Sequence, residues 1–428
     1  MAFREVLDNG MIFRTVEDER DAERYIEFNR SFNNASEGAN CKNLLLHHPQ
    51  INREDFQFIE DGLTGEILST TCLIPWECEF EGIPLRAAML ELVLSHPDHR
   101  KSGLVRIQMD RFQKVVEDKG YDISIIWGIP YYYRQYGYTY CIYGNTADIL
   151  PTGYIPAAAD VGGNAYTLRK AAEEDIGELL CLYKAAHKHL QFYITRDEAF
   201  WKFFIKDSKA PVWLVVNKSS GKAAGYIVCR DFGGKSVHIA EGCIAEMDAG
   251  RAVLGLLNTG KASEIIISWP ECSTLVKLAR SLGSIARQPG QWLVRIHDIS
   301  RFLRKIGPVL EKRIAESACA GVSRYVVINL YRQAYKLKFS GGRLADVMSL
   351  GFVDSSMGAD GGALCIPPDA FVRLVTGFRS LDRLSDAWPD ILVKPGEKYL
   401  LDVLFPETEA YFNAPFSYYG EVYSGKVE

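Results

Sequence analysis

Two segments of the chain carry side chains that could do chemistry together. Arg100, Lys101 and Gly103 form a basic, glycine-containing segment, and a tyrosine-rich segment follows about thirty residues later, at residues 131–138. Arginine and lysine bind anions such as a diphosphate, and glycine lets the backbone approach such a group. A tyrosine phenol, with a pKa of about 10, can donate a proton to a leaving group. Together the two segments could bind a diphosphate and protonate a leaving group.

The residues around the basic segment predict a strand, a turn and a helix. Residues 90–94 are largely apolar, which suits a buried strand, and Pro97 cannot donate to a strand ladder. Residues 104–116 carry apolar side chains at close to helical spacing, and this pattern stops before Gly120. We therefore expect a helix that begins next to Gly103.

The expected start of this helix is a suitable anion site. The first backbone N–H groups of a helix have no partner within it, and the positive end of the helix dipole lies there as well. Gly103 would let the backbone approach phosphates, while Arg100 and Lys101 add positive charge. An ordinary strand-to-helix turn without a ligand would show the same local pattern. The order of the surrounding elements is therefore needed to distinguish an anion site from such a turn.

The order of these elements resembles the second half of the GNAT-type N-acetyltransferase domain. A strand, a proline, a basic loop and a helix are followed by an apolar run at residues 123–127 and then by the tyrosine-rich segment. The family writes the loop as R/Q-x-x-G-x-G/A, which matches Arg100 and Gly103. Val105 stands at the last position instead of glycine or alanine, and we expect it to crowd the loop.

The resemblance implies that acetyl-CoA is the co-substrate. Backbone groups at the end of the strand would bind the pantetheine arm, the loop and helix start would bind the pyrophosphate, and two residues after the next strand would lie near the thiol. In that order these positions are Val93, Leu94 and Ser95; Arg100, Lys101, Ser102, Gly103, Leu104, Val105 and Arg106; and Gly128 and Ile129.

A tyrosine motif of the same family supplies the general acid. The pattern Tyr-x-x-Phe/Tyr-Gly-Tyr/Phe falls on residues 133–138, with Tyr133 in first place. The resemblance thus implies that Tyr133 protonates the departing CoA thiolate. The residues alone do not separate Tyr133 from Tyr131 and Tyr132, because an aromatic cluster is as well suited to a core or a pocket wall.

The proton acceptor has three candidates. An amine attacks a thioester only when neutral, so an alkylammonium with a pKa of about 10 must first lose a proton. Residues 403–406 resemble a segment of the enhanced intracellular survival acetyltransferases, which use the C-terminal carboxylate, and this resemblance implies Glu428, although the tail after these residues is longer than that family usually carries. Glu91 is a local alternative, since a desolvated carboxylate suits a base, but it could equally form a structural salt bridge. Water is the third candidate.

Composition bounds the class of protein. With 428 residues and 47% apolar content, the chain can bury a large core and is expected to form two or three domains. It has no apolar run of about eighteen residues and no charged-then-apolar leader, so we expect a cytoplasmic protein without a membrane partner. The net charge of −5 argues against a nucleic-acid partner.

The spacing of cysteine and histidine predicts no metal site. The ten cysteines are dispersed without a C-x-x-C pair, which is typical of small buried hydrophobes in a reduced cytosol. His47 with His48, and His187 with His189, come closest to a metal pattern. Nothing in the sequence supplies the remaining ligands, so we expect surface or core histidines and no metal.

The expected fold class is α+β, with units at residues 1–150, 151–290 and 291–428. The first would be a GNAT-like domain that holds the acetyl-CoA site. The second repeats its strand-and-helix pattern without the R-x-x-G-x-G/A loop, so we expect a GNAT-like domain that has lost cofactor binding. The third, through residues 292–296 and 374–380, resembles a domain built like sterol carrier protein.

This three-part arrangement resembles the enhanced intracellular survival family of acetyltransferases over nearly the whole chain. The resemblance implies acetyl transfer from acetyl-CoA to a primary amine of a small molecule or a lysine. It also implies a homo-oligomer, either a trimer or a hexamer made of two trimers. Two alternatives stay open: a non-enzymatic acyl-CoA or lipid binding protein, and an enzyme that transfers another acyl group such as propionyl.

Overall fold

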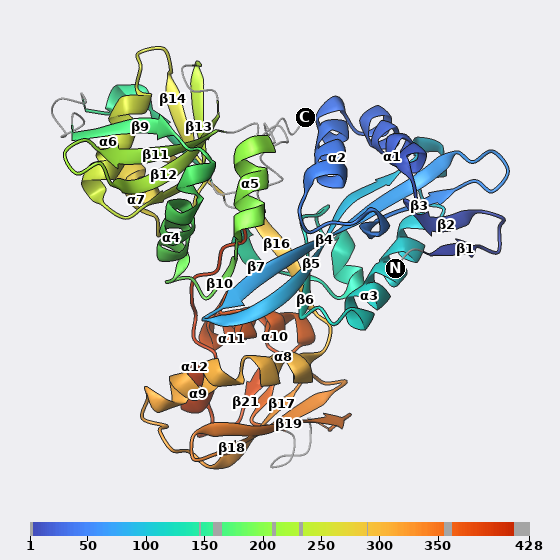
Figure 1. The fold of residues 1–428 in the computed structure, drawn as a ribbon. Helices are drawn as coiled ribbons and strands as arrows, with labels where there is room; N and C mark the ends of the chain where they lie inside the picture. Colours follow the sequence, from blue (N-terminus) through green and yellow to red (C-terminus); the bar gives the residue numbers. More distant parts are fainter. Residues whose placement is uncertain are drawn as a thin grey trace.

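The chain folds into three mixed β-sheets with helices packed against them. The structure, a computed structural model, describes residues 3–144, 147–156, 165–207, 211–230, 234–288, 290–354 and 362–414. Within these residues the three sheets and their helices confirm the expected α+β class. Figure 1 shows three bodies, which run from blue to cyan, from green to yellow and from orange to red.

The first sheet is formed mainly by the N-terminal third of the chain. Its strands are antiparallel except for β5 and β6, which are parallel and joined by helix α3. Parallel neighbours need such a crossover, and this one carries the basic loop. The spatial order is β1 (Arg4–Val6), β2 (Ile12–Thr15), β3 (Phe56–Glu60), β4 (Ile67–Phe80), β5 (Ile83–Ser95), β6 (Ile123–Ile126), β16 (Gly290–Ile296) and β7 (Thr139–Gly144), with β10 (Phe192–Ile194) paired to β4.

The second sheet repeats the plan of one parallel pair among antiparallel strands. Here β13 and β14 are the parallel pair, and helix α6 joins them. The spatial order is β15 (Ile285–Arg287), β8 (Ala147–Pro151), β14 (Glu264–Ile267), β13 (Ser236–Ile244), β12 (Ala223–Arg230), β11 (Val212–Asn217) and β9 (Tyr166–Lys170).

Two strands cross between these sheets. β8 follows β7 in the chain but pairs with β14 and β15, whereas β16 follows the second sheet and lies between β6 and β7 (Figure 1). Residues 292–296, which we expected to open the third unit, therefore belong to the first sheet. Their largely buried Trp-Leu-Val-Arg-Ile run suits an internal strand with partners on both sides.

The third sheet lies in the C-terminal part of the chain. β17 and β20 are parallel, and their neighbours are antiparallel. The spatial order is β19 (Arg343–Gly351), β18 (Ala334–Ser340), β17 (Arg324–Asn329), β20 (Leu364–Cys365) and β21 (Leu392–Val393). The likeness of this body to sterol carrier protein stays a prediction.

Helices cover both faces of the first sheet. Successive side chains of β5 point to opposite faces, and their contacts show which helices cover which face. Ala87 and Met89 lie in the same apolar cluster as residues of α1 and α2, whereas Ala88 and Leu90 lie in the cluster that contains residues of α3. The helices are α1 (Glu19–Phe32), α2 (Ala35–His47), α3 (Leu104–Asp118), α4 (Ile176–His187), α5 (Glu198–Asp207), α6 (Met247–Leu257), α7 (Thr274–Ser281), α8 (Ile299–Lys305), α9 (Gly307–Ala315), α10 (Pro368–Val375), α11 (Leu381–Ala387) and α12 (Lys398–Leu404). Among these helices, none is long and apolar enough to span a membrane.

Candidate active site

The parallel pair β5 and β6 separates before β5 ends. The two strands are in register from Ala87 to Met89, and β5 then continues to Ser95 without pairing to β6 in the described sheet. Leu92 has a φ of 53°, and the register with β4 shifts at this point, which is the signature of a β-bulge. The strand segment predicted to bind a pantetheine arm therefore has one edge without a strand partner.

Two hydroxyl groups of β4 hold the bulge in place. Thr70 Oγ1 donates to the carbonyl of Leu92 at 3.0 Å, and Ser69 Oγ donates to the carbonyl of Leu94 at 2.9 Å. These hydrogen bonds occupy acceptors on the side of β5 that faces β4. They fix the backbone of the bulge so that its opposite edge is preorganised for a ligand.

The basic loop and the start of α3 form a cradle of backbone donors. Lys101 and Gly103 have φ values of 65° and 88°, so the chain turns sharply before α3. The first described backbone bond of the helix runs from the N–H of Ile107 to the carbonyl of Gly103, at 3.2 Å. The N–H groups of residues 104–106 thus precede the helical ladder, as expected for an anion site. The predicted helix start next to Gly103 is confirmed.

Three cations surround this cradle. Arg100, Lys101 and Arg106 are exposed, and the ion pairs among described residues include none of the three. Ser102 is also exposed, and its hydroxyl donates to the carbonyl of His99. The side chains left without an acidic partner can neutralise a bound phosphate, so the residues present fit the pyrophosphate of a CoA molecule.

Val105, which was expected to crowd the loop, stands in the first turn of α3. Its side chain is partly buried and packs against the apolar cluster that contains Tyr133, as do Val93 and Tyr132. Leu104 is buried in a neighbouring cluster. Both side chains at the helix start therefore pack against apolar clusters of the first body.

Tyr133 and Tyr138 are the buried tyrosines of the predicted segment, 4% and 2% exposed. Tyr133 lies in a short 3₁₀ helix, Tyr132–Tyr136, whereas Tyr131 is 76% exposed. The Tyr133 ring packs directly on Gly128, where an added Cβ would stand 2.2 Å from Tyr133 Cε2. Gly128 thus provides room for the tyrosine ring, a role that sequence reasoning missed. Ile129, at 67% exposed, lies at the surface beside it.

The electrostatic surroundings keep the Tyr133 phenol protonated. Burial raises its pKa well above the usual value, and the nearby carboxylate of Glu91 and the neighbouring tyrosines raise it further. The hydroxyl of Tyr138 is engaged with Ser124 Oγ at 2.7 Å. For the Tyr133 hydroxyl, the hydrogen bonds of the described residues include no partner. Tyr133 is therefore a protonated donor that is available to a ligand.

Glu91 lies next to the bulge on the face of β5 covered by α1 and α2. Its pKa is raised to about 8 overall, first by burial and then by Glu37 on α2, while the N–H of Leu92 partly offsets both effects. The pKa of Glu37 is itself raised by burial. Sequence reasoning missed Glu37, although Asn34, whose side chain accepts from the N–H of Glu37, marks the start of α2.

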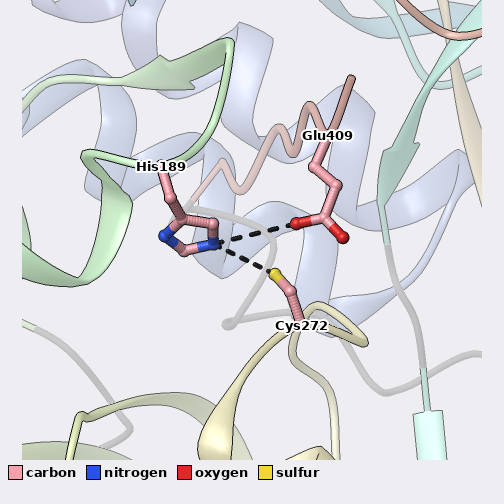
Figure 2. Close-up of side chains that lie close together, drawn as sticks. All are labelled: His189, Cys272 and Glu409. Carbon is pink, nitrogen blue, oxygen red and sulfur yellow. Dashed lines mark hydrogen bonds and ion pairs between the residues drawn. The ribbon is translucent and has the colours of Figure 1, made fainter. Parts of the chain in front are cut away.

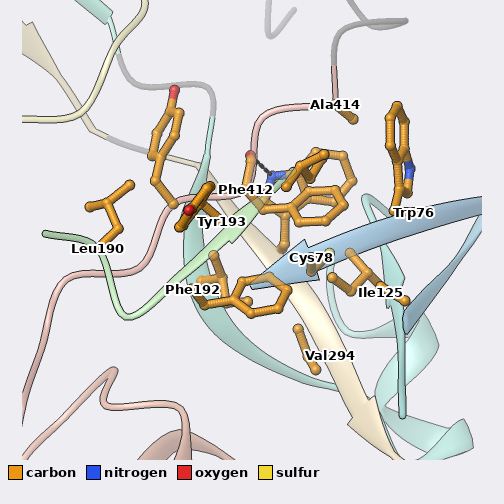
Figure 3. Packing of buried hydrophobic residues seen from close by; sticks show 14 of the residues in the cluster. Trp76, Cys78, Ile125, Leu190, Phe192, Tyr193, Val294, Phe412 and Ala414 are labelled. Atoms are coloured by element: carbon orange, nitrogen blue, oxygen red, sulfur yellow. Dashed lines mark hydrogen bonds between the residues drawn. The ribbon is translucent and has the colours of Figure 1, made fainter. Parts of the chain in front are cut away.

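The C-terminal segment returns to the first body. Trp292 Nε1 in β16 donates to the carbonyl of Phe412 at 2.9 Å, and the Phe412 ring lies 6.4 Å from that of Trp76 in β4. Figure 3 shows Phe412 and Ala414 among buried side chains of the first sheet. Glu428, the predicted base, lies outside the described residues, so its position relative to Tyr133 stays a prediction.

The second sheet offers a matched position without the cradle. Glu241 stands two residues beyond Ile239, the last residue of β13 in register with β14, just as Glu91 stands two residues beyond Met89. Arg196 pairs with Glu241 at 2.6 Å, and both side chains are fully buried. At the start of α6, acidic side chains replace the basic loop, with Glu246 at the N-cap and Asp248 in the first turn.

Comparisons with known proteins agree with this geometry. Residues 14–141 match the family model described as acetyltransferase (GNAT) domain. A search of curated proteins found no match to the sequence. The matched residues include the end of β2, strands β3 to β6, the basic loop, α3 and the tyrosine segment. The N-terminal part of the chain therefore matches the GNAT acetyltransferase domain, a class of domain that uses an acyl-CoA co-substrate.

Solved structures resemble the chain over nearly its whole length. A probable N-acyltransferase from Enterococcus faecalis has a TM-score of 0.71 at 15% identity, and a GCN5-related N-acetyltransferase from Kribbella flavida has 0.66 at 16%; each comparison covers 94% of this chain and 99% of the other. Eis1 from Mycobacterium abscessus has a TM-score of 0.62 at 16% identity, with 95% and 99% covered. At these identities the likeness shows that the three-body fold is shared.

Proposed function

We propose that the protein transfers an acetyl group from acetyl-CoA to a primary amine of a small molecule or a lysine. The observation that carries this proposal is the joining of three features in the first body. These are the unpaired edge of β5 after Met89, the donor-rich start of α3 after Gly103, and the buried phenol of Tyr133 in the cluster between them. The GNAT match over residues 14–141 supports the assignment of acyl transfer.

Each part of the candidate site would hold one part of the donor. The N–H groups of residues 104–106, with Arg100 and Lys101, would bind the pyrophosphate. Backbone groups of residues 93–95 would hydrogen-bond the pantetheine arm along the open strand edge. The thioester would then lie toward Gly128 and Tyr133, since these residues pack together at the end of β6.

The reaction is a direct transfer. The neutral amine nitrogen bonds to the thioester carbon, the carbon–sulfur bond breaks, and Tyr133 donates its proton to the departing sulfur. The nitrogen gives up a proton to a base, and the Tyr133 phenolate then recovers one from solvent. The raised pKa of Tyr133 ensures that the proton is present at neutral pH.

Two proton acceptors belong to the proposal. Glu91 has a pKa of about 8 and lies beside the bulge, so it can accept a proton directly or through water near neutral pH. The second acceptor is the C-terminal carboxylate of Glu428, which the resemblance to the enhanced intracellular survival family implies. The described chain up to Ala414, which leads back to the first sheet, supports this second possibility.

Tyr133→Phe tests the proposed general acid. We expect kcat for an accepted amine to fall about 10²- to 10⁴-fold, because the sulfur loses its proton donor while the ring still packs on Gly128. Release of CoA thiol would be measured with polyamines, aminoglycosides and lysine peptides, and with acetyl-CoA and propionyl-CoA as donors. Tyr131→Phe, at an exposed position, is the matched control and should behave like the parent.

The outcome separates the proposal from its alternatives. Unchanged turnover in Tyr133→Phe would remove the tyrosine from the mechanism. Tight CoA binding without thiol release for any amine would favour a non-enzymatic acyl-CoA binding protein. Faster turnover with propionyl-CoA than with acetyl-CoA would show that the enzyme prefers to transfer a propionyl group. A trimer or hexamer, a cytoplasmic location and a sterol-carrier-like third body remain predictions, and light scattering tests the assembly.

A further inference from the structure

A second cluster of reactive side chains lies away from the first sheet's candidate site. His189 follows α4, Cys272 precedes α7, and Glu409 belongs to the segment after α12. Figure 2 shows the imidazole, thiol and carboxylate pointing toward one another from these three segments. One ligand atom from each lies within 4.8 Å of the other two. Sequence spacing predicted no metal at His189, because its partners here are 83 and 220 residues away along the chain.

The geometry fits a shared ion better than a proton relay. His189 Nε2 lies 3.2 Å from Cys272 Sγ and 3.9 Å from Glu409 Oε2. A Cys–His–carboxylate relay uses both ring nitrogens, one toward each partner, whereas both contacts here converge on Nε2. Ligands of a tetrahedral Zn²⁺ would be about 3.3 to 3.6 Å apart, given bonds of about 2.0 Å to nitrogen and oxygen and about 2.3 Å to sulfur.

The backbone around the cluster is held in place. Gln191 N–H donates to the carbonyl of Glu409 at 2.7 Å, and Tyr411 N–H donates to the carbonyl of Phe192 at 3.1 Å. This short ladder fixes the segment of Glu409 beside that of His189. The Trp269 ring, three residues before Cys272, lies 5.5 Å from the ring of Tyr411. The three segments are therefore anchored within a few residues of each ligand, which favours a preorganised site.

The neighbouring acidic side chains are already committed to arginines. Glu271 pairs with Arg280 at 3.0 Å, and Glu407 pairs with Arg383 at 2.8 Å. The carboxylate of Glu409 is instead directed to the imidazole of His189 (Figure 2). This division leaves one carboxylate, one imidazole and one thiol as a ligand set, rather than a general acidic patch.

We propose that His189, Cys272 and Glu409 bind a Zn²⁺ ion that joins the second body to the C-terminal segment. Nitrogen, thiolate sulfur and carboxylate oxygen are the donors that Zn²⁺ accepts together, whereas Ca²⁺ and Mg²⁺ take oxygen ligands. Water completes the coordination, since the side chains of His189 and Glu409 are 47% and 61% exposed. Cys272 and Glu409 also line a pocket of about 340 Å³, through which the ion would enter.

The test is a titration of the full-length chain, purified with a reductant and freed of metal by chelation. Zn²⁺ would be added in competition with a chromophoric chelator, and Co²⁺ would be used as a spectroscopic probe. We expect one ion per chain and a thiolate-to-Co²⁺ charge-transfer band. Cys272→Ser should abolish the band and weaken Zn²⁺ binding more than about 100-fold, because loss of an outer-shell partner alone costs 10- to 100-fold.

Cys181→Ser, at an exposed cysteine on α4, is the matched control and should bind as the parent does. Glu409→Gln provides a second variant at an exposed residue in case Cys272→Ser does not fold, and it should also weaken Zn²⁺ binding. The proposal is overturned if the parent takes up no stoichiometric ion. It is equally overturned if both ligand variants bind Zn²⁺ with the parent's affinity.

Discussion

The first and second sheets place a glutamate at the same point of the same backbone plan, with opposite surroundings. Glu91 and Glu241 each stand two residues beyond the last paired residue of a parallel strand pair. Burial, together with the nearby carboxylate of Glu37, raises the pKa of Glu91 to about 8. Burial alone would raise the pKa of Glu241, but Arg196 and the hydroxyl of Tyr226 lower it overall.

The helix that follows each strand shows the same contrast. The start of α3 has three exposed cations and backbone N–H groups available to an anion, whereas the start of α6 has Glu246 and Asp248. Acidic side chains at a helix N-terminus stabilise the helix dipole but repel a phosphate. The comparison indicates what separates a candidate anion site from a packed core on the same topology. In the first sheet the charges at the helix start have no acidic partner among the described residues, whereas in the second sheet the buried glutamate is paired with an arginine.

The largest expected effect comes from removing the compensating charge of the second sheet. Arg196→Met would leave Glu241 buried without its cation, and we expect the free energy of unfolding to fall by about 3–5 kcal/mol. Urea denaturation measures this loss. Arg196→Met combined with Glu241→Gln should recover part of it, because the uncompensated charge is then absent. A loss that the double variant does not reduce would mean that packing, rather than charge, dominates this position.

A smaller effect is expected at the cradle of the first sheet. Arg100→Ala should weaken CoA binding about 10- to 100-fold, since a hydrogen bond to a charged group contributes about 1.5–3 kcal/mol. Calorimetric titration with CoA at two salt concentrations checks this value. Arg251→Ala, in the first turns of α6, is the control and should leave CoA binding unchanged. Equal losses in both variants would contradict the assignment of one cradle.

The most diagnostic effect concerns the pH dependence of stability at Glu91. Its folded-state pKa of about 8 lies above the usual value, so the stability that its neutral form contributes is present below pH 4.5 and is lost as the pH rises to about 8. The glutamine of Glu91→Gln cannot ionise. The difference between the Tm of this variant and the Tm of the parent should therefore increase in the variant's favour as the pH rises through this range. Thermal unfolding from pH 5 to 9 measures the difference. A constant difference would show that Glu91 ionises normally.

The same variant examines the proton acceptor. If Glu91 is the base, kcat of the parent rises with pH through about 8, and Glu91→Gln loses this rise. A variant that retains the parent's pH profile would leave the terminal carboxylate of Glu428 or water as acceptor.

Local sequence rules predicted the elements of the candidate site but not its long-range partners. The start of α3 could be predicted from Gly103 and the apolar spacing after it, and β6 from its apolar run, because both signals lie within one element. The positions of β8 and β16 could not, since consecutive strands usually pair with each other and these two exchange sheets. The partners of His189 are equally remote in sequence, which is why spacing indicated no metal.

The exchange of β8 and β16 also sets the order in which the protein can be completed during synthesis. β6 and β7 leave the ribosome without the strand that lies between them, and β16 follows about 150 residues later. At 5–20 residues per second this interval is roughly 8 to 30 seconds, during which two strand edges of the first sheet stay unpaired. The candidate site and the second body are therefore completed together, and a fragment that ends before Gly290 would lack an internal strand of the first sheet.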